Sequence, residues 1–260
     1  MTIDRVTITG ADDFTDPKDL VELSEEFPFV EWGILLSASK EGMGPRFPSP
    51  KWIEELAQFK DKINLAGHIC GSWVRKLAVN IDNSVFKERP EFLEYFPRIQ
   101  LNFSCYDVAP KMVEILPKNH KFILQIANKG IADKIKLVDF SREKLHSGEL
   151  SCLTNLSIVF DRSGGKGILP NKWPKPIENV YCGYAGGLGP DNLAEQIAVI
   201  TETVGNETLY EVDPPFPAYK AEIPFWIDME SKVRTDEKFD LKKVRESLEI
   251  CKPWVKSEIH

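Results

Sequence analysis

The sequence predicts an α/β fold, a single-domain (β/α)8 TIM barrel that spans residues 1–260, and three observations lead to it. Short β-branched or apolar runs alternate with longer amphipathic segments, as in parallel strands joined by right-handed helical crossovers. There are eight such runs, and eight β/α units in about 250 residues favour a closed barrel over an open sheet. No linker, low-complexity tract or charge block divides the chain.

Each expected element follows from the local pattern of residues. The strands are expected at residues 6–10, 32–36, 63–70, 98–102, 122–126, 156–160, 179–182 and 225–228. Helices are expected at residues 16–23, 49–56, 73–77, 108–116, 134–145, 191–200 and 241–250, whereas little that looks helical follows the sixth strand. Two of these helices begin with a capping residue and a proline, Asp16-Pro17 and Ser49-Pro50, and proline suits the first helical turn.

Residues 209–213 are a rival for the eighth strand. The run at residues 225–228 is preferred, because an amphipathic helix follows it at the right distance.

The composition is that of an ordinary globular protein. The chain has 33 Lys and Arg against 40 Asp and Glu, a net charge of −7, and no basic tract, which argues against nucleic-acid binding. Its five cysteines are scattered and form no CxxC pair, so neither a disulfide framework nor a zinc finger is indicated. No signal-peptide pattern and no apolar stretch of about 20 residues is present. We expect a cytoplasmic monomer or homodimer that binds no membrane and needs no cofactor.

Two aspartates stand where barrel enzymes place their chemistry, at the carboxyl ends of strands. Asp161 follows the sixth apolar run, and Asp228 closes the eighth. A carboxylate at the barrel mouth beside apolar side chains is placed to act as a general acid or base. Either aspartate could instead cap a helix or order a loop.

Glycine-rich loops follow the sixth and seventh expected strands. They cover residues 163–167 and 186–192. Glycines let backbone N–H groups approach an anion closely, and a helix N-terminus adds a favourable dipole, so the two loops together favour phosphate binding. Each loop alone could equally serve a tight turn. The glycines expected to contact phosphate are Gly164, Gly165, Gly186 and Gly187.

A polar pair lies on the third expected strand. His68 and Cys70 are two residues apart and therefore face the same side, where they would join Gln100 and Asn102 of the next strand if that side is the barrel interior. Histidine titrates near neutral pH, and a neighbouring cysteine could be activated as a thiolate. The pair could also ligate a metal, but no clear third ligand is present, so no metal site is predicted. Simple burial is the alternative for both.

Several segments share a likeness to one family. Gly186-Gly-Leu-Gly-Pro-Asp-Asn192 is similar to a Gly-Gly-Leu-x-Pro-Glu-Asn motif, which is the most specific match. The other matching segments are Ile8-Thr-Gly10, Gly33-Ile-Leu-Leu36 with Pro45-Arg-Phe-Pro-Ser49, Ile99-Gln-Leu-Asn102, Asp161 with Gly164-Gly-Lys-Gly167, and Asp228-Met-Glu-Ser231. Over nearly its whole length the chain thus resembles phosphoribosylanthranilate isomerase, the (β/α)8 enzyme of tryptophan biosynthesis that performs an Amadori rearrangement.

The resemblance implies roles for individual residues. The family's reaction needs an acid to open the ribose ring, which by position is Asp161, and a base to take the C2 proton. The family's base is a cysteine, and Thr9 stands in its place here. A threonine hydroxyl is a poor base near neutral pH, so the base would come from Asp228, His68 or Cys70. Substrate contacts are expected from Arg46, Gln100, Asn102 and Thr9, and phosphate contacts from Ser231 together with the four glycines.

Two functions remain open from the sequence. The first is an enzyme that isomerises, or otherwise moves a proton on, a small phosphorylated sugar or related metabolite. The second is a non-catalytic descendant that keeps the barrel as a ligand-binding or regulatory protein, which the loss of the cysteine favours. Glu230 replaces a small residue of the family and would oppose a phosphate if it pointed inward. Glu31, before the second strand, is interpreted as a solvated end.

Overall fold

A computed structural model describes residues 3–102, 115–126, 155–163, 166–177, 180–205, 208–210, 219–221 and 224–255. The helix expected at 134–145 lies outside these residues, and the one expected at 108–116 lies almost wholly outside them.

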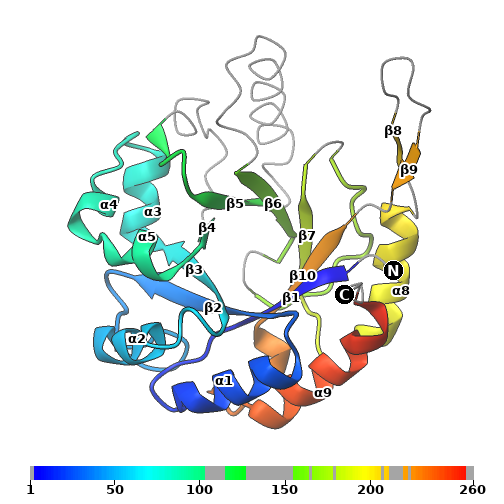
Figure 1. Cartoon of the computed structure of the whole chain (residues 1–260), viewed down its shortest axis with the longest axis horizontal. Helices are drawn as coiled ribbons and strands as arrows, with labels where there is room; N and C mark the ends of the chain where they lie inside the picture. The colour runs from blue at the N-terminus through cyan, green and yellow to red at the C-terminus, as the bar shows by residue number, and fades with distance from the viewer. Residues whose placement is uncertain are drawn as a thin grey trace.

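Eight parallel strands close into a barrel in the order β1-β10-β7-β6-β5-β4-β3-β2 (Figure 1). Their bounds are β1 (Ile3–Thr9), β2 (Val30–Ser37), β3 (Asn64–Cys70), β4 (Arg98–Leu101), β5 (Lys121–Ile126), β6 (Leu156–Asp161), β7 (Cys182–Ala185) and β10 (Phe225–Met229). The (β/α)8 prediction is therefore confirmed.

The predicted position of the seventh strand was wrong by three residues, since β7 begins only at Cys182. β7 contains small residues, which are not typical of a strand in the sequence. A Cβ on Gly183 would lie 2.1 Å from Cε2 of Trp226 on β10, so the indole occupies the space that a side chain on β7 would need. The position of β7 can therefore be recognised only when its contact with Trp226 is known.

Helices surround the strands, as Figure 1 shows for α1, α2, α8 and α9. Their bounds are α1 (Pro17–Glu26), α2 (Pro50–Ala57), α3 (Gly71–Ala78), α4 (Val85–Glu88), α5 (Glu91–Tyr95), α8 (Leu193–Val204) and α9 (Leu241–Cys251), with the 3-10 turns η2 (Ser231–Val233) and η3 (Lys252–Trp254). The two predicted caps form: Asp16 Oδ1 accepts a hydrogen bond from Lys18 N at 2.9 Å, and Ser49 Oγ accepts one from Trp52 N at 3.2 Å. None of the helices within the described ranges is both long and apolar enough to cross a membrane.

Two small antiparallel hairpins lie outside the barrel sheet. β8 (Thr208–Tyr210) pairs with β9 (Tyr219–Ala221), and β11 (Arg234–Thr235) pairs with β12 (Lys238–Phe239). Among the described residues, 209 and 210 of the rival position belong to β8, which pairs with β9, whereas β10 takes the eighth place in the barrel, so the preferred position is confirmed.

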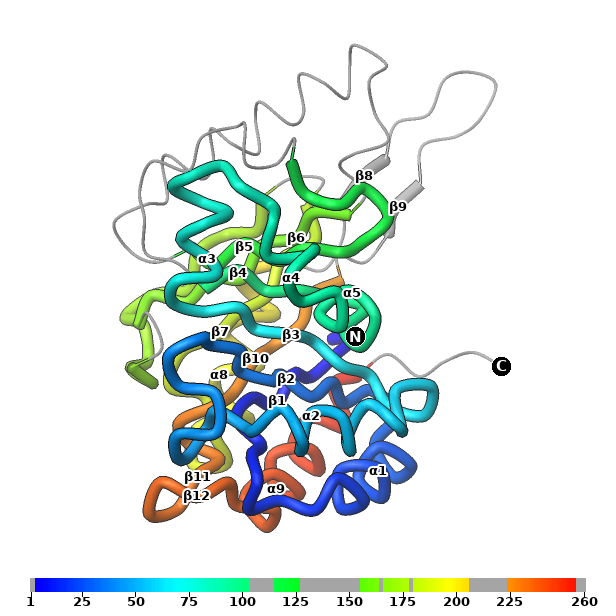
Figure 2. Tube along the Cα trace, turned by 90° about the vertical axis from the view of Figure 1, so that its left-hand side faces the viewer, coloured from blue at the N-terminus to red at the C-terminus, as the bar shows by residue number. Residues whose placement is uncertain are grey.

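The first and last helices meet where the barrel closes. Figure 2 shows α1 beside α9, and Arg245 Nη1 of α9 donates to Glu26 Oε2 of α1. An isolated bridge between Ile3 and Val255 ties the end of the described chain to β1.

The barrel interior holds a buried ion cluster, and Glu31 belongs to it. The interpretation of Glu31 as a solvated end was wrong: it is 0% exposed, and it accepts hydrogen bonds from Arg5 Nη1 at 2.7 Å and Arg98 Nη1 at 2.8 Å. Burial alone would raise the pKa of Glu31, but the two arginines hold it below its usual value. The Arg98 guanidinium also lies 4.6 Å from the ring centroid of Trp226. Glu31 and Arg98 lie at the starts of β2 and β4, so this cluster occupies the amino-terminal part of the barrel.

Candidate functional site

Asp228 and Thr9 form a hydrogen-bonded pair at the barrel mouth. Asp228 lies on β10 and Thr9 ends the neighbouring β1, and Thr9 Oγ1 donates to Asp228 Oδ1 at 2.8 Å. The two residues are 8% and 1% exposed. Burial raises the pKa of Asp228 to about 8; the bond from Thr9 opposes this, and the nearby carboxylates of Glu230 and Asp161 reinforce it. At neutral pH Asp228 therefore holds a proton.

Asp161 has a different environment. It is the last residue of β6 and is buried, yet Gln125 Nε2 of β5 donates to its Oδ2 at 2.6 Å. Its Oδ1 accepts hydrogen bonds from Ser163 N at 3.0 Å and Ser163 Oγ at 2.7 Å. These hydrogen bonds fix the orientation of the carboxyl group at the barrel mouth. The sequence analysis predicted a site role for neither Gln125 nor Ser163. Gln125 could have been noticed, because it is a polar residue at an inward-facing position of an otherwise apolar strand.

The two aspartates border one cavity of about 40 Å³. The cavity lies between the loops that follow β6, β7 and β10, and its walls include Ser163, Gly167, Gly186, Gly187 and Ser231. The two glycine-rich loops lie close together, because a Cβ on Gly186 would lie 3.8 Å from Ser163 Cβ, and a Cβ on Gly187 would lie 2.4 Å from Leu169 N just beyond the first loop. Gly164 and Gly165, two of the expected phosphate contacts, lie outside the described residues.

Arg46 is engaged by carboxylates of its own chain. Its Nη1 lies 3.0 Å from Glu230 Oε1 and its Nη2 lies 3.0 Å from Glu237 Oε2. Its backbone is in the left-handed region, with φ 83°, and its N–H donates to Asp12 Oδ2 at 2.7 Å. Glu230 does point toward the cavity of the two aspartates. Burial raises the pKa of Glu230, while Arg46 and Arg234 oppose the shift.

His68 lies inside the barrel next to Thr9. Gly33 of β2 separates them, and a Cβ there would lie 2.1 Å from Thr9 Oγ1 and 3.0 Å from His68 Nε2, so a larger residue is excluded. His68 is 1% exposed, and its Nε2 has no hydrogen-bond partner among the described residues. Burial lowers the pKa of His68 to about 4, which makes its imidazole a weak base.

Cys70 joins the predicted cluster with Gln100 and Asn102. Asn102 Nδ2 donates to Cys70 Sγ at 3.4 Å, and Gln100 Nε2 donates to Asn102 Oδ1 at 2.9 Å. Burial raises the pKa of Cys70 to about 11, so the thiol stays protonated at neutral pH and is not the activated thiolate of the sequence-based hypothesis. Across the described part of the chain, no three His, Cys, Asp or Glu side chains are placed to hold a metal ion.

Comparison with solved structures finds the same architecture in phosphoribosylanthranilate isomerases. The enzyme from Thermus thermophilus matches with a TM-score of 0.59 and 16% identity, over 96% of this chain and 99% of that chain. A phosphoribosylanthranilate isomerase in complex with reduced 1-(o-carboxyphenylamino)-1-deoxyribulose 5-phosphate matches with a TM-score of 0.57 and 14% identity, over 96% and 100% of the two chains.

A further match is the phospho-2-dehydro-3-deoxyheptonate aldolase from Thermotoga maritima, with a TM-score of 0.51 and 13% identity over 97% of this chain and 69% of that one. No protein-family model matches the chain, nor does any curated protein sequence. At these identities the likeness is one of fold: the chain is similar in architecture to phosphoribosylanthranilate isomerases, as the sequence motifs predicted.

Proposed function

We propose that this barrel is an isomerase-type enzyme that moves a proton on a small phosphorylated sugar or a related metabolite. One observation carries the proposal: two buried carboxyl groups, Asp161 and Asp228, border the same cavity at the carboxyl-terminal mouth, where burial raises the pKa of Asp228 to about 8 and Asp161 accepts hydrogen bonds from Gln125 and Ser163. Pairs of titratable groups whose surroundings push their pKa values apart are typical of general acid and general base partners.

In the proposed mechanism Asp228 is the general acid. With a pKa of about 8 it keeps its proton at neutral pH and can donate it to an oxygen of the substrate as a ring opens. Asp161 then acts as the base and accepts a proton from carbon, while Gln125 and Ser163 hold its carboxylate in position. This assignment exchanges the roles that family position alone implies.

The described cavity of about 40 Å³ has room for one polar group of a ligand, and its walls are compatible with a phosphate or hydroxyl group. Ser163 and Ser231 supply hydroxyl groups, and Gly186 and Gly187 let a ligand approach the backbone. The three carboxyl groups at the cavity oppose an anion less than their number suggests, because Asp228 is neutral at pH 7 and Arg46 pairs with Glu230. A related barrel holds a deoxyribulose 5-phosphate compound, which supports the same ligand class here.

A non-catalytic binding protein is the second candidate. Thr9 stands where the resembling family has its catalytic cysteine, and its hydroxyl is occupied by Asp228. Cys70 stays protonated and His68 is weakly basic, so neither supplies a substitute base near neutral pH.

The test combines turnover with binding. Phosphoribosylanthranilate is the first substrate to assay, with the wild type, Asp161→Asn, Asp228→Asn and the matched control Asp236→Asn, which changes an exposed turn residue at φ 49° where asparagine is well tolerated. Thermal shifts with ribose 5-phosphate, ribose and inorganic phosphate measure binding separately.

Turnover that both site variants abolish and the control retains would support the enzyme. Stabilisation by ribose 5-phosphate without turnover would favour the binding protein. The proposal fails if no phosphorylated sugar raises the melting temperature and no turnover is found.

A further inference from the structure

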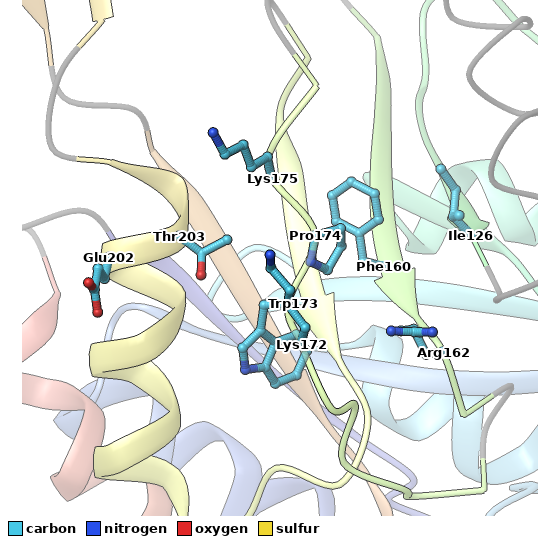
Figure 3. A pocket seen from close by; sticks show the side chains of 9 residues that line it. All are labelled: Ile126, Phe160, Arg162, Lys172, Trp173, Pro174, Lys175, Glu202 and Thr203. Atoms are coloured by element: carbon cyan, nitrogen blue, oxygen red, sulfur yellow. The ribbon is translucent and has the colours of Figure 1, made fainter.

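A second cavity lies on the outer face of β6, away from the barrel mouth. It has a volume of about 610 Å³ and borders Phe160 and Ile126, whose side chains point outward from the strands (Figure 3). Asp161, the next residue after Phe160, faces the interior, because successive side chains of a strand point to opposite faces. We propose that this outer cavity binds a small organic anion with an aromatic or hydrocarbon body.

No helix follows β6 directly within the described residues. In the described residues 166–177 the chain that follows this strand is irregular, whereas the outer face of a barrel strand is ordinarily covered by a helix. The irregular segment is anchored at two points. Trp173 Nε1 donates to Gln196 Oε1 of α8 at 3.0 Å, and Tyr184 Oη donates to Pro174 O at 3.2 Å. The wall is therefore formed before any ligand arrives.

The lining combines apolar surface with positive charge. Phe160, Trp173 and Pro174 supply the apolar part. Arg162, Lys172 and Lys175 supply cations, and Figure 3 shows Phe160 and Pro174 between Lys175 and Arg162. Within the described chain neither lysine takes part in an ion pair, and Glu202 is the single carboxylate among the described lining residues. The local charge is thus opposite in sign to the net charge of −7 of the whole chain.

These features select one class of ligand. A volume of this size falls within the range of small-molecule sites, about 300–1,000 Å³. Inorganic phosphate would leave the apolar floor unused, and a neutral aromatic molecule would leave Lys172 and Lys175, which form no ion pair within the described residues, without a partner. A phosphate or carboxylate attached to an aromatic ring or a short hydrocarbon satisfies both parts of the lining.

The test uses phenyl phosphate as the probe and the full chain as the binding partner. Titration calorimetry compares phenyl phosphate with inorganic phosphate and with phenol. The double variant Lys172→Glu with Lys175→Glu should weaken phenyl phosphate binding about tenfold or more. The matched control reverses two exposed lysines far from the cavity, Lys18 and Lys62.

A second pair of variants tests the cavity itself. Thr203→Phe places a ring into the cavity from α8 and should abolish binding, whereas Ala194→Phe, on the opposite and exposed face of α8, should not. The proposal is overturned if phenyl phosphate does not bind, if inorganic phosphate binds equally well, or if the cavity variants behave like their controls. Asp161→Asn and Asp228→Asn should leave this binding intact, so the result is independent of the proposed function.

Discussion

Replacing Asp228 with asparagine should remove a defined part of the pH dependence of stability. The pKa of Asp228 is raised from 3.8 to about 8, so between these values the folded chain binds one more proton than the unfolded chain. The free energy of unfolding of the wild type should therefore fall as the pH rises through this window, at up to about 1.4 kcal/mol per pH unit. Above the folded pKa the loss is complete.

The most useful window runs from about pH 6.5 to about pH 8, because most of the effect of His68 on stability falls below it, between the folded pKa of about 4 and the ordinary value of 6.5. Across it Asp228 should lower the stability of the wild type by about 2 kcal/mol. Asp228→Asn cannot ionise and should lose this decline, while its amide oxygen can still accept the hydrogen bond from Thr9.

Urea unfolding at several pH values measures both proteins. Glu230, Asp161 and Glu31 are the other carboxyl groups that act on Asp228. Asp161→Asn is therefore the informative control: it removes one neighbouring charge, so the decline should persist and shift to lower pH. If the free energy of unfolding depends on pH in the same way for the wild type and Asp228→Asn, Asp228 does not carry the extra proton. That result would also refute its role as the proposed general acid.

Three further substitutions test the interior. Gly33→Ala should destabilise the fold by about 1–3 kcal/mol in urea unfolding through its clash with Thr9, and adding Thr9→Ala should recover part of the loss; strict additivity would contradict the contact. His68 has a folded pKa of about 4, below its ordinary 6.5, so stability should drop by about 3 kcal/mol as the pH falls through that window. His68→Leu should show a smaller drop, and an unchanged drop would argue against a neutral buried imidazole. Glu31→Gln leaves Arg98 buried without its carboxylate and should cost about 3–5 kcal/mol in the same assay; a loss below about 1 kcal/mol would place Glu31 outside the ion cluster.

Local signals in the sequence were enough to predict most of the fold. Capping residues before a proline marked α1 and α2, and β-branched runs marked most strands, because these features act within a few residues. β7 was misplaced because its small residues make room for Trp226, which lies more than forty positions along the chain. Glu31 was misjudged because a lone charge in a sequence resembles a surface residue until the two arginines beside it are known.

The candidate site divides in the same way. The positions of Asp161 and Asp228 at the barrel mouth followed from their places at the ends of apolar runs. The raised pKa of Asp228 could not be predicted, because it depends on burial by the surrounding strands, and the partners Gln125 of Asp161 and Thr9 of Asp228 belong to other strands. The expected activation of Cys70 failed for a related reason: how deeply a strand residue is buried depends on the whole ring of neighbours.

The alternation of side chains along β6 places two cavities back to back on one strand, with Asp161 on one side and Phe160 on the other. A strand in a closed barrel is hydrogen-bonded on both edges, so it moves as a unit with its neighbours. A ligand that displaces β6 from outside would change the position of the carboxylate inside. Thermodynamic linkage makes this coupling reciprocal, so occupancy of the mouth would alter affinity at the outer cavity by the same factor.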